Sequence, residues 1–106
     1  LMMGADAIAV SNSALQAIGC LGMRACGSNN CPVGIATQKE NLRSRLIIDS
    51  SAKQLHTFFD AARDLIKVVA RSCGHDDIVK FNKDDLSTFD REIHHLTGIA
   101  YAGTNP

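Results

Sequence analysis

The sequence has no excess of charge of either sign. Among its 106 residues, 11 Lys and Arg are balanced by 11 Asp and Glu. A chain without net positive charge has no electrostatic basis for binding a polyanion. We therefore expect neither a nucleic-acid partner nor a membrane-surface partner.

A secretion signal and a long hydrophobic run are also missing. The first ten residues, LMMGADAIAV, are apolar, but no basic run leads them, no small-residue cleavage pattern follows, and Asp6 interrupts them. We expect a cytoplasmic protein. In that compartment the four cysteines are expected to be free or metal-bound thiols rather than disulfides.

The sequence contains no internal repeat and no low-complexity tract, and its length fits one small domain. The apolar run Ile8–Val10 predicts a strand buried on both faces, as in a parallel sheet. A single strand cannot satisfy its own backbone hydrogen-bonding groups. We therefore expect a fragment of a longer polypeptide that is mainly helical in isolation.

Three helices are predicted. Residues 14–18 follow the capping candidates Ser11, Asn12 and Ser13, and Gly19 can end this helix. A short helix is expected near residues 41–46 and a long amphipathic one near residues 51–73, ended by Gly74. The apolar face of the long helix is expected to be buried against another part of the protein and contains Leu55, Phe59, Ala62, Ile66 and Val69.

Polar pairs near the end of the chain have structural explanations. Asp76-Asp77 and Asp84-Asp85 lie at expected turn and helix starts, where capping is a better explanation than acid–base catalysis. Adjacent residues on a helix point about 100° apart, so His94-His95 is interpreted as a solvated pair rather than a metal site.

The cysteines provide the most informative pattern. Cys20, Cys26 and Cys31 follow the spacing C-x5-C-x4-C, and Pro32 comes directly after the third. Zinc sites usually have close ligand pairs at C-x2-4-C, whereas an iron–sulfur cluster accepts thiolates that arrive from different directions. The glycine-rich segment between residues 20 and 38 resists regular structure, and a bound cluster would order it.

Two alternatives remain at this point. One is that the three thiols are unrelated small residues of a flexible loop. A zinc ion with His56 or His75 as a fourth ligand is the other possibility.

The same residues resemble a known family, the FMN-binding domain of glutamate synthase. The resemblance covers nearly the whole chain and is strongest in the following residues: Gly4-Ala5-Asp6, Ala14-Leu15, Ala17-Ile18-Gly19-Cys20, Arg24, Cys26, Asn29, Cys31-Pro32-Val33-Gly34-Ile35-Ala36-Thr37-Gln38 and Leu42-Arg43. It implies an α/β fold in which this chain is the C-terminal fragment of a (β/α)8 barrel. Residues 1–19 would be the last βα unit, residues 20–38 the iron–sulfur loop, and residues 39–106 a C-terminal helical region.

The resemblance also implies a function. Family members make glutamate from 2-oxoglutarate by reductive amination, with electrons passing through an iron–sulfur cluster to FMN. The family's cluster is of the 3Fe-4S type, which agrees with three rather than four ligand cysteines at residues 20, 26 and 31. The implied partners are the remainder of a glutamate synthase chain and an electron donor such as a ferredoxin or an NAD(P)H-dependent subunit. The isolated 106-residue chain is not expected to catalyse the reaction.

By the same resemblance, Ser11, Asn12 and Ser13 lie where the family binds the FMN phosphate. Barrel enzymes often hold a phosphate at a helix N-terminus after the last strands. The family commonly has Gly-Thr-Ala here, and glycine allows a closer backbone approach to a phosphate. Simple helix capping by these residues is the alternative.

A second function, from a different class, is also compatible with the cysteine pattern. It is a stand-alone iron–sulfur or zinc module for electron transfer or binding that contains no flavin. A barrel sequence encoded upstream in the same frame would favour the enzyme fragment.

Overall fold

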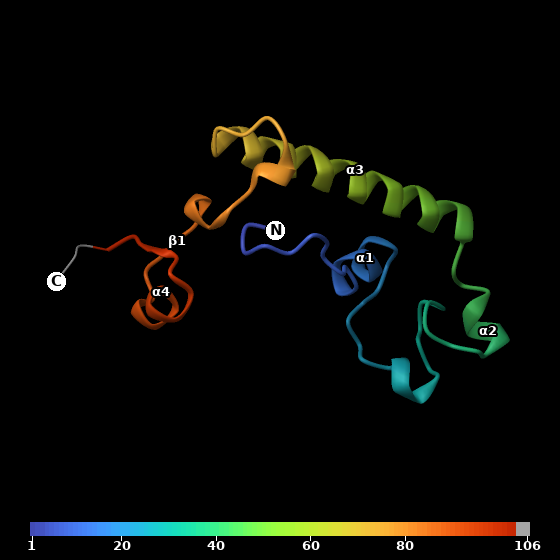
Figure 1. Cartoon of the computed structure of the whole chain (residues 1–106). Coiled ribbons are helices and arrows are strands. Elements are labelled where there is room, and N and C mark those ends of the chain that lie inside the picture. Colours follow the sequence, from blue (N-terminus) through green and yellow to red (C-terminus); the bar gives the residue numbers. More distant parts are fainter. Residues whose placement is uncertain (104–106) are drawn as a thin grey trace. The chain divides into compact units, whose positions relative to one another are not determined.

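A computed structural model describes residues 1–103 and shows a mainly helical chain, as expected (Figure 1). Its contacts divide the chain into two compact units, which are described separately. One unit consists of Ala9–Arg63, and the other combines Leu1–Ile8 with the chain from Asp64 onward. The boundaries of these two units differ from the segment boundaries expected from the sequence. The expected segment boundaries remain predictions.

Helix α1 spans Asn12–Ala17, and Gly19, with a φ of 107°, follows its end as expected. The prediction of a strand just before α1 is wrong for this structure. Residues 8–10 have no regular structure, and the side chains of Ile8 and Val10 are exposed. No neighbouring strand in the described part of the chain pairs with this segment, so its backbone groups cannot form a ladder.

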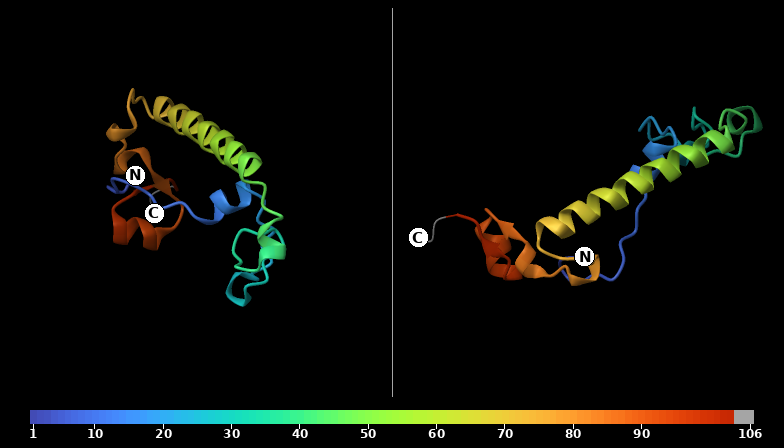
Figure 2. Two further views of the ribbon diagram at one scale, coloured as in Figure 1. Left: turned by 90° about the vertical axis from the view of Figure 1, so that its right-hand side faces the viewer. Right: turned by 90° about the horizontal axis from the view of Figure 1, so that it is seen from above.

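The segment from Cys26 to Leu46, called the cysteine loop here, is more ordered than its composition predicts. It begins with the 3₁₀ helix η1, Cys26–Ser28, and contains helix α2, Glu40–Arg43 (Figure 2). The backbone at Gly34 has a φ of 80° and lies so close to α2 that a Cβ atom would overlap the Leu42 carbonyl oxygen. Arg45 Nη1 donates a hydrogen bond of 2.9 Å to the Pro32 carbonyl, which adds a second connection across the loop.

Helix α3 spans Ile48–Ser72 and confirms the long helix expected from the periodic apolar residues. Gly74, with a φ of 81°, ends it, and the His75 amide donates to the Ala70 carbonyl at 2.9 Å. Within residues 1–103, most of the predicted apolar face has no cover: Phe59 is 44% exposed and Val69 46%.

Two 3₁₀ helices follow α3, and one residue of each acidic pair takes part in capping, although the N-cap of the second helix is Asn82. Helix η2, Ile78–Lys80, is capped by Asp77, whose side chain accepts from the Val79 amide at 3.0 Å. In helix η3, Lys83–Asp85, the Asn82 side chain accepts a hydrogen bond from the backbone of the turn, and the Asp85 side chain accepts one from the Asn82 amide. Together these two bonds form a capping box.

A small βαβ unit ends the described chain and was not foreseen from the sequence. Strands β1, Ser87–Thr88, and β2, Ala100–Tyr101, pair in parallel and are connected by α4, Arg91–Thr97. The Asp90 side chain caps α4 by accepting from two amides of its first turn, at 2.8 and 3.0 Å. His94 Nδ1 lies 2.6 Å from the Ile99 carbonyl oxygen, so this residue is not simply solvated.

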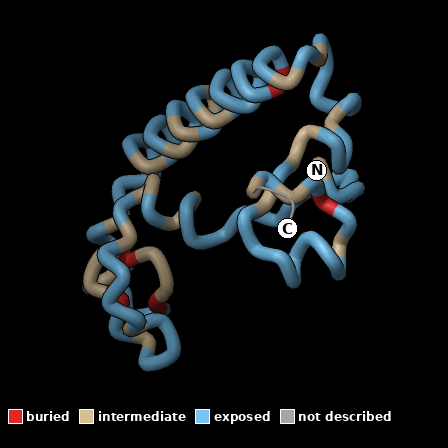
Figure 3. Tube along the Cα trace, turned by 90° about the vertical axis from the view of Figure 1, so that its left-hand side faces the viewer, coloured by how far each residue is buried: buried red, intermediate tan, exposed pale blue. Residues whose placement is uncertain are grey.

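Burial is sparse and uneven along the chain. Among residues 1–103 only five are buried, and three of these lie in the cysteine loop, while α3 and the βαβ unit contain one each (Figure 3): Cys31, Gly34, Thr37, Ala70 and Ile99. The cysteine loop is therefore the best-enclosed region, although it contains little regular structure. In the described residues, no helix has both the length and the hydrophobicity needed to cross a membrane.

Candidate metal centre

Cys31 is the most enclosed of the four thiols, with 7% of the residue exposed. The pKa of its thiol is below the usual value, chiefly because the Ala36 amide hydrogen-bonds to the sulfur. Burial acts in the opposite direction, and the amides of Val33, Ile35 and Gly34 add to the lowering of the pKa. A lowered pKa favours the thiolate, which is the form that binds metals.

The other two predicted ligand thiols are more open. Cys20 is half-buried after α1, and its Sγ accepts a hydrogen bond from the Gly22 amide at 3.4 Å. Cys26 begins η1 and is exposed. The intervening residues 21–25 have no regular structure, and Gly22 and Arg24 have positive φ values of 69° and 54°.

The structure does not bring the three predicted ligands together. In the described part of the chain, no group of three or more His, Cys, Asp or Glu side chains is arranged to hold a metal ion. The chemistry of the donors nevertheless fits a cluster, because thiolates are the usual ligands and amide hydrogen bonds to sulfur tune such sites. To bind one cluster, the three thiols would have to come closer together than they are in this structure.

Both histidines considered as zinc ligands have other partners. His56 Nε2 lies 3.0 Å from Asp60 Oδ2 on the exposed surface of α3. His75 Nε2 contacts the Asp85 carboxylate at 2.8 Å. A role for either in a zinc site would require that these pairs be broken.

The three residues expected at the FMN phosphate lie at the start of α1. Ser11, Asn12 and Ser13 are all exposed. Ser11 occupies the N-cap position, but its side chain makes no capping hydrogen bond. Capping by Ser11, the alternative explanation for this residue, is therefore not realised in this structure.

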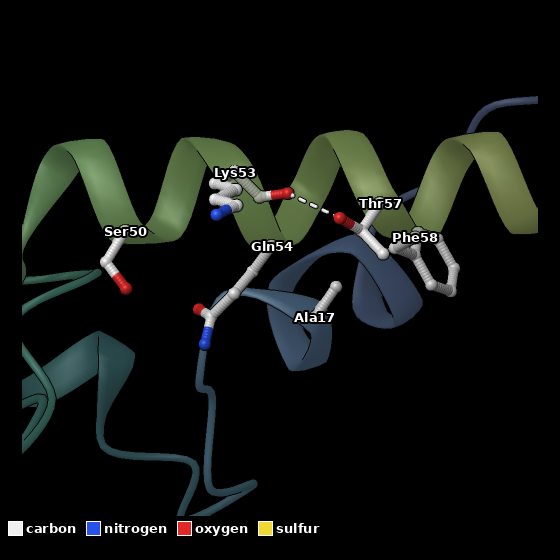
Figure 4. A pocket seen from close by; sticks show the side chains of 6 residues that line it. All are labelled: Ala17, Ser50, Lys53, Gln54, Thr57 and Phe58. Atoms are coloured by element: carbon white, nitrogen blue, oxygen red, sulfur yellow. Dashed lines mark hydrogen bonds between the residues drawn. The ribbon is translucent and has the colours of Figure 1, made fainter.

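A shallow groove of about 460 Å³ lies between α1 and the first half of α3 (Figure 4). Ala17 from α1 faces α3 across it, and the Gln54 side chain extends toward the same space. Thr57 Oγ1 donates to the Lys53 carbonyl at 3.0 Å, within its own helix. The six lining residues include no carboxylate, histidine or cysteine, so the groove has no acid–base pair: Ala17, Ser50, Lys53, Gln54, Thr57 and Phe58.

Two polar residues near Cys31 have a larger structural role than the sequence indicated. The Thr37 hydroxyl is 2.7 Å from the main-chain oxygen of Asn29 and 3.1 Å from its side-chain oxygen. Thr37 is 7% exposed, which is unusual for a polar side chain. In the sequence, Asn29 and Thr37 were notable only as part of the family motif. Composition alone does not reveal a contact between residues that are eight positions apart.

Comparison with known proteins identifies the source of this pattern. Residues 1–76 match the profile of a family described as "Conserved region in glutamate synthase". A ferredoxin-dependent glutamate synthase of Pyropia yezoensis is 33% identical over 101 residues, which cover 92% of this chain and 6% of that protein.

Two further relatives match shorter segments. Ferredoxin-dependent glutamate synthase 2 of Synechocystis is 50% identical over 44 residues, covering 42% of this chain and 3% of the relative. The large chain of an NADPH glutamate synthase from Azospirillum brasilense is 32% identical over 69 residues, covering 65% of this chain and 4% of the relative.

The chain thus spans only a small part of these relatives' lengths, 6% for the Pyropia yezoensis protein. No solved structure matches it. The family profile covers well over half of the 106 residues and includes the whole cysteine motif. This chain belongs to the glutamate synthase family.

Proposed function

We propose that this chain is the cluster-carrying segment of a glutamate synthase-type oxidoreductase, with Cys20, Cys26 and Cys31 as the ligands of an iron–sulfur cluster. The family match is the observation that supports this assignment most directly, because it covers residues 1–76 and includes all three cysteines. Three ligand thiols favour a 3Fe-4S over a 4Fe-4S cluster. The whole enzyme would make glutamate from 2-oxoglutarate by reductive amination.

The ligand residues would have unequal roles. Cys31 is held in a well-enclosed segment, so it would provide a fixed first ligand. Cys20 and Cys26 lie on either side of an irregular, exposed stretch that can adjust when a cluster binds. When bound, the cluster would supply one-electron transfer to FMN.

FMN would bind mainly through the remainder of the barrel, with Ser11, Asn12 and Ser13 near its phosphate. The exposure of all three side chains is compatible with this role. In this proposal, residues 1–19 are the last βα unit of the barrel, and Ile8–Val10 forms a strand only when a neighbouring strand is present. Residues 20–38 form the cluster loop and residues 39–106 the C-terminal helical region.

The electron donor would be a ferredoxin or an NAD(P)H-dependent subunit. Among the relatives reported above, two are named as ferredoxin-dependent and one as an NADPH enzyme. The longer match to the ferredoxin-dependent protein of Pyropia yezoensis favours ferredoxin.

Metal analysis tests the cluster assignment. Protein purified without oxygen is expected to be brown and to contain iron and acid-labile sulfide. Cys26→Ala should abolish the colour, whereas Cys73→Ala is the matched control, because Cys73 lies outside the cysteine loop. Stoichiometric zinc without iron or sulfide would instead support a zinc module and overturn the proposal.

A further inference from the structure

The segment that contains Cys31 is closed by a set of hydrogen bonds that we call the Asn29 clasp. Asn29 Oδ1 is 3.1 Å from Thr37 Oγ1 and accepts from the Gln38 amide at 2.5 Å. The main-chain oxygen of Asn29 is 2.7 Å from the same hydroxyl. Thr37 Oγ1 in turn accepts from the Lys39 amide at 3.1 Å. The clasp therefore joins the residue two before Cys31 to residues six and more positions after it.

The backbone of Asn29 contributes as well. Its φ and ψ of 62° and 22° place it in the left-handed region, where it ends η1. Asparagine, aspartate and glycine tolerate this conformation better than other residues. Since η1 begins at Cys26, this turn sets the direction of the chain between Cys26 and Cys31.

The clasp encloses the Cys31 thiol. Cys31 and Thr37 are both only 7% exposed. Residues 33–36, which follow Cys31, also lie inside the closed segment. Opening the clasp would expose the sulfur.

We infer that Asn29 is a positioning residue that fixes Cys31 for the cluster, by accepting hydrogen bonds from Thr37 and Gln38. This inference rests on the iron–sulfur function proposed above. A residue that merely supports the turn would need only its left-handed backbone. A positioning residue needs the side-chain oxygen too.

Four variants separate these roles. Asn29→Gly keeps the left-handed backbone but removes the acceptor oxygen. Asn29→Asp keeps an acceptor and is the conservative rescue. Thr37→Val removes the hydroxyl from the other side of the clasp. Asn30→Ala is the matched control, because the Asn30 side chain is exposed and, within residues 1–103, hydrogen-bonds only to Ser28 and Lys39.

The first measurement needs no metal. The full chain, freed of metal and reduced, is treated with iodoacetamide, and labelling of each cysteine is followed by mass spectrometry. Asn29→Gly and Thr37→Val should speed the labelling of Cys31 by about tenfold, because hydrogen bonds that close the segment are lost. Asn29→Asp and Asn30→Ala should label as the wild type does. Unchanged labelling of Cys31 in both Asn29→Gly and Thr37→Val would overturn the inference.

The second measurement concerns the cluster. After anaerobic reconstitution, Asn29→Gly should retain less iron and sulfide than the wild type and give an altered electron paramagnetic resonance spectrum, whereas Asn29→Asp should restore both. A normal spectrum and full loading in Asn29→Gly would show that the cluster does not need the clasp, which overturns the positioning role.

The two measurements also separate failure of this inference from failure of the proposed function. If the wild type takes up no iron–sulfur cluster, the proposed function is wrong, yet Cys31 labelling still decides whether Asn29 holds the segment. Far-ultraviolet circular dichroism, dominated by the helices, checks that each variant is folded.

Discussion

His75 Nε2 lies 2.9 Å from Oδ1 and 2.8 Å from Oδ2 of Asp85, so one imidazole nitrogen contacts both oxygens of the carboxylate. The Asp85 side chain is only 9% exposed and also accepts from the Asn82 amide at 2.9 Å. This hydrogen bond from Asn82 is the largest cause that lowers the Asp85 pKa, and His75 lowers it further. The pair connects the end of α3 with η3.

The contribution of Asp85 should depend on pH. Because folding lowers its pKa, the stabilisation is complete above the pKa of the unfolded carboxyl group, about 3.9, and is lost as pH falls through the folded pKa. Asp85→Asn should therefore be less stable than the wild type at pH 7, and this difference should shrink below about pH 4. Urea denaturation across this pH range measures it. Asp84→Asn, at the exposed neighbouring position, should change little, and a difference for Asp85→Asn that does not vary with pH would contradict the prediction.

Gly34 provides a test of the cysteine loop. Gly34→Ala should destabilise the loop because a Cβ would meet backbone atoms of Leu42 and Leu46. In addition, the φ of Gly34 is 80°, which disfavours any residue with a Cβ. The left-handed backbone alone costs an L-residue about 1–2 kcal/mol, and the overlap adds to this. Gly27→Ala is the control, since a Cβ there meets nothing within 4 Å. Limited proteolysis should cut the loop faster in Gly34→Ala, and equal cleavage of the two variants would show that the approach to α2 is not required.

The exposed face of α3 predicts a dependence on the rest of the protein. In the isolated chain Phe59 is 44% exposed, so Phe59→Ala should cost much less than the about 3–5 kcal/mol of a buried phenylalanine. If the remainder of the enzyme covers this face, as the periodic apolar residues predict, the full cost should appear in the longer chain. Lys67→Ala should stay within about 0.5 kcal/mol in both. Chemical denaturation of both lengths measures this, and an equally small cost for Phe59→Ala in the longer chain would exclude the face as a docking surface.

FMN should not bind tightly to the 106-residue chain alone. At most one phosphate-contacting turn, at Ser11–Ser13, is present, and the proposed ring contacts come from other barrel loops. A titration monitored by flavin fluorescence should show no saturation of binding at micromolar FMN. Stoichiometric micromolar binding would mean that the flavin site is complete here and that the fragment interpretation is wrong.

Local sequence signals predicted α1, α2, α3 and the Asp77 cap, but they did not predict α4. The apolar residues from Leu55 to Val69 recur at helical spacing, which is sufficient to indicate α3. Asp77 accepts from the amide two residues later, so its capping role needs only local geometry. The cysteine spacing and its surrounding motif were enough to identify the family, because those residues are contiguous in sequence.

Contacts between distant residues were decided only by the tertiary structure. Ile8–Val10 has strand-like composition but no partner strand among the described residues, so it forms none. Strands β1 and β2 have two residues each, too few for a periodic signal, and they exist because α4 brings Thr88 beside Tyr101. The order of the cysteine loop depends on the contact between Asn29 and Thr37 and on the approach of Gly34 to α2. Both require groups that are not neighbours in the sequence to meet, and composition alone does not specify such pairs.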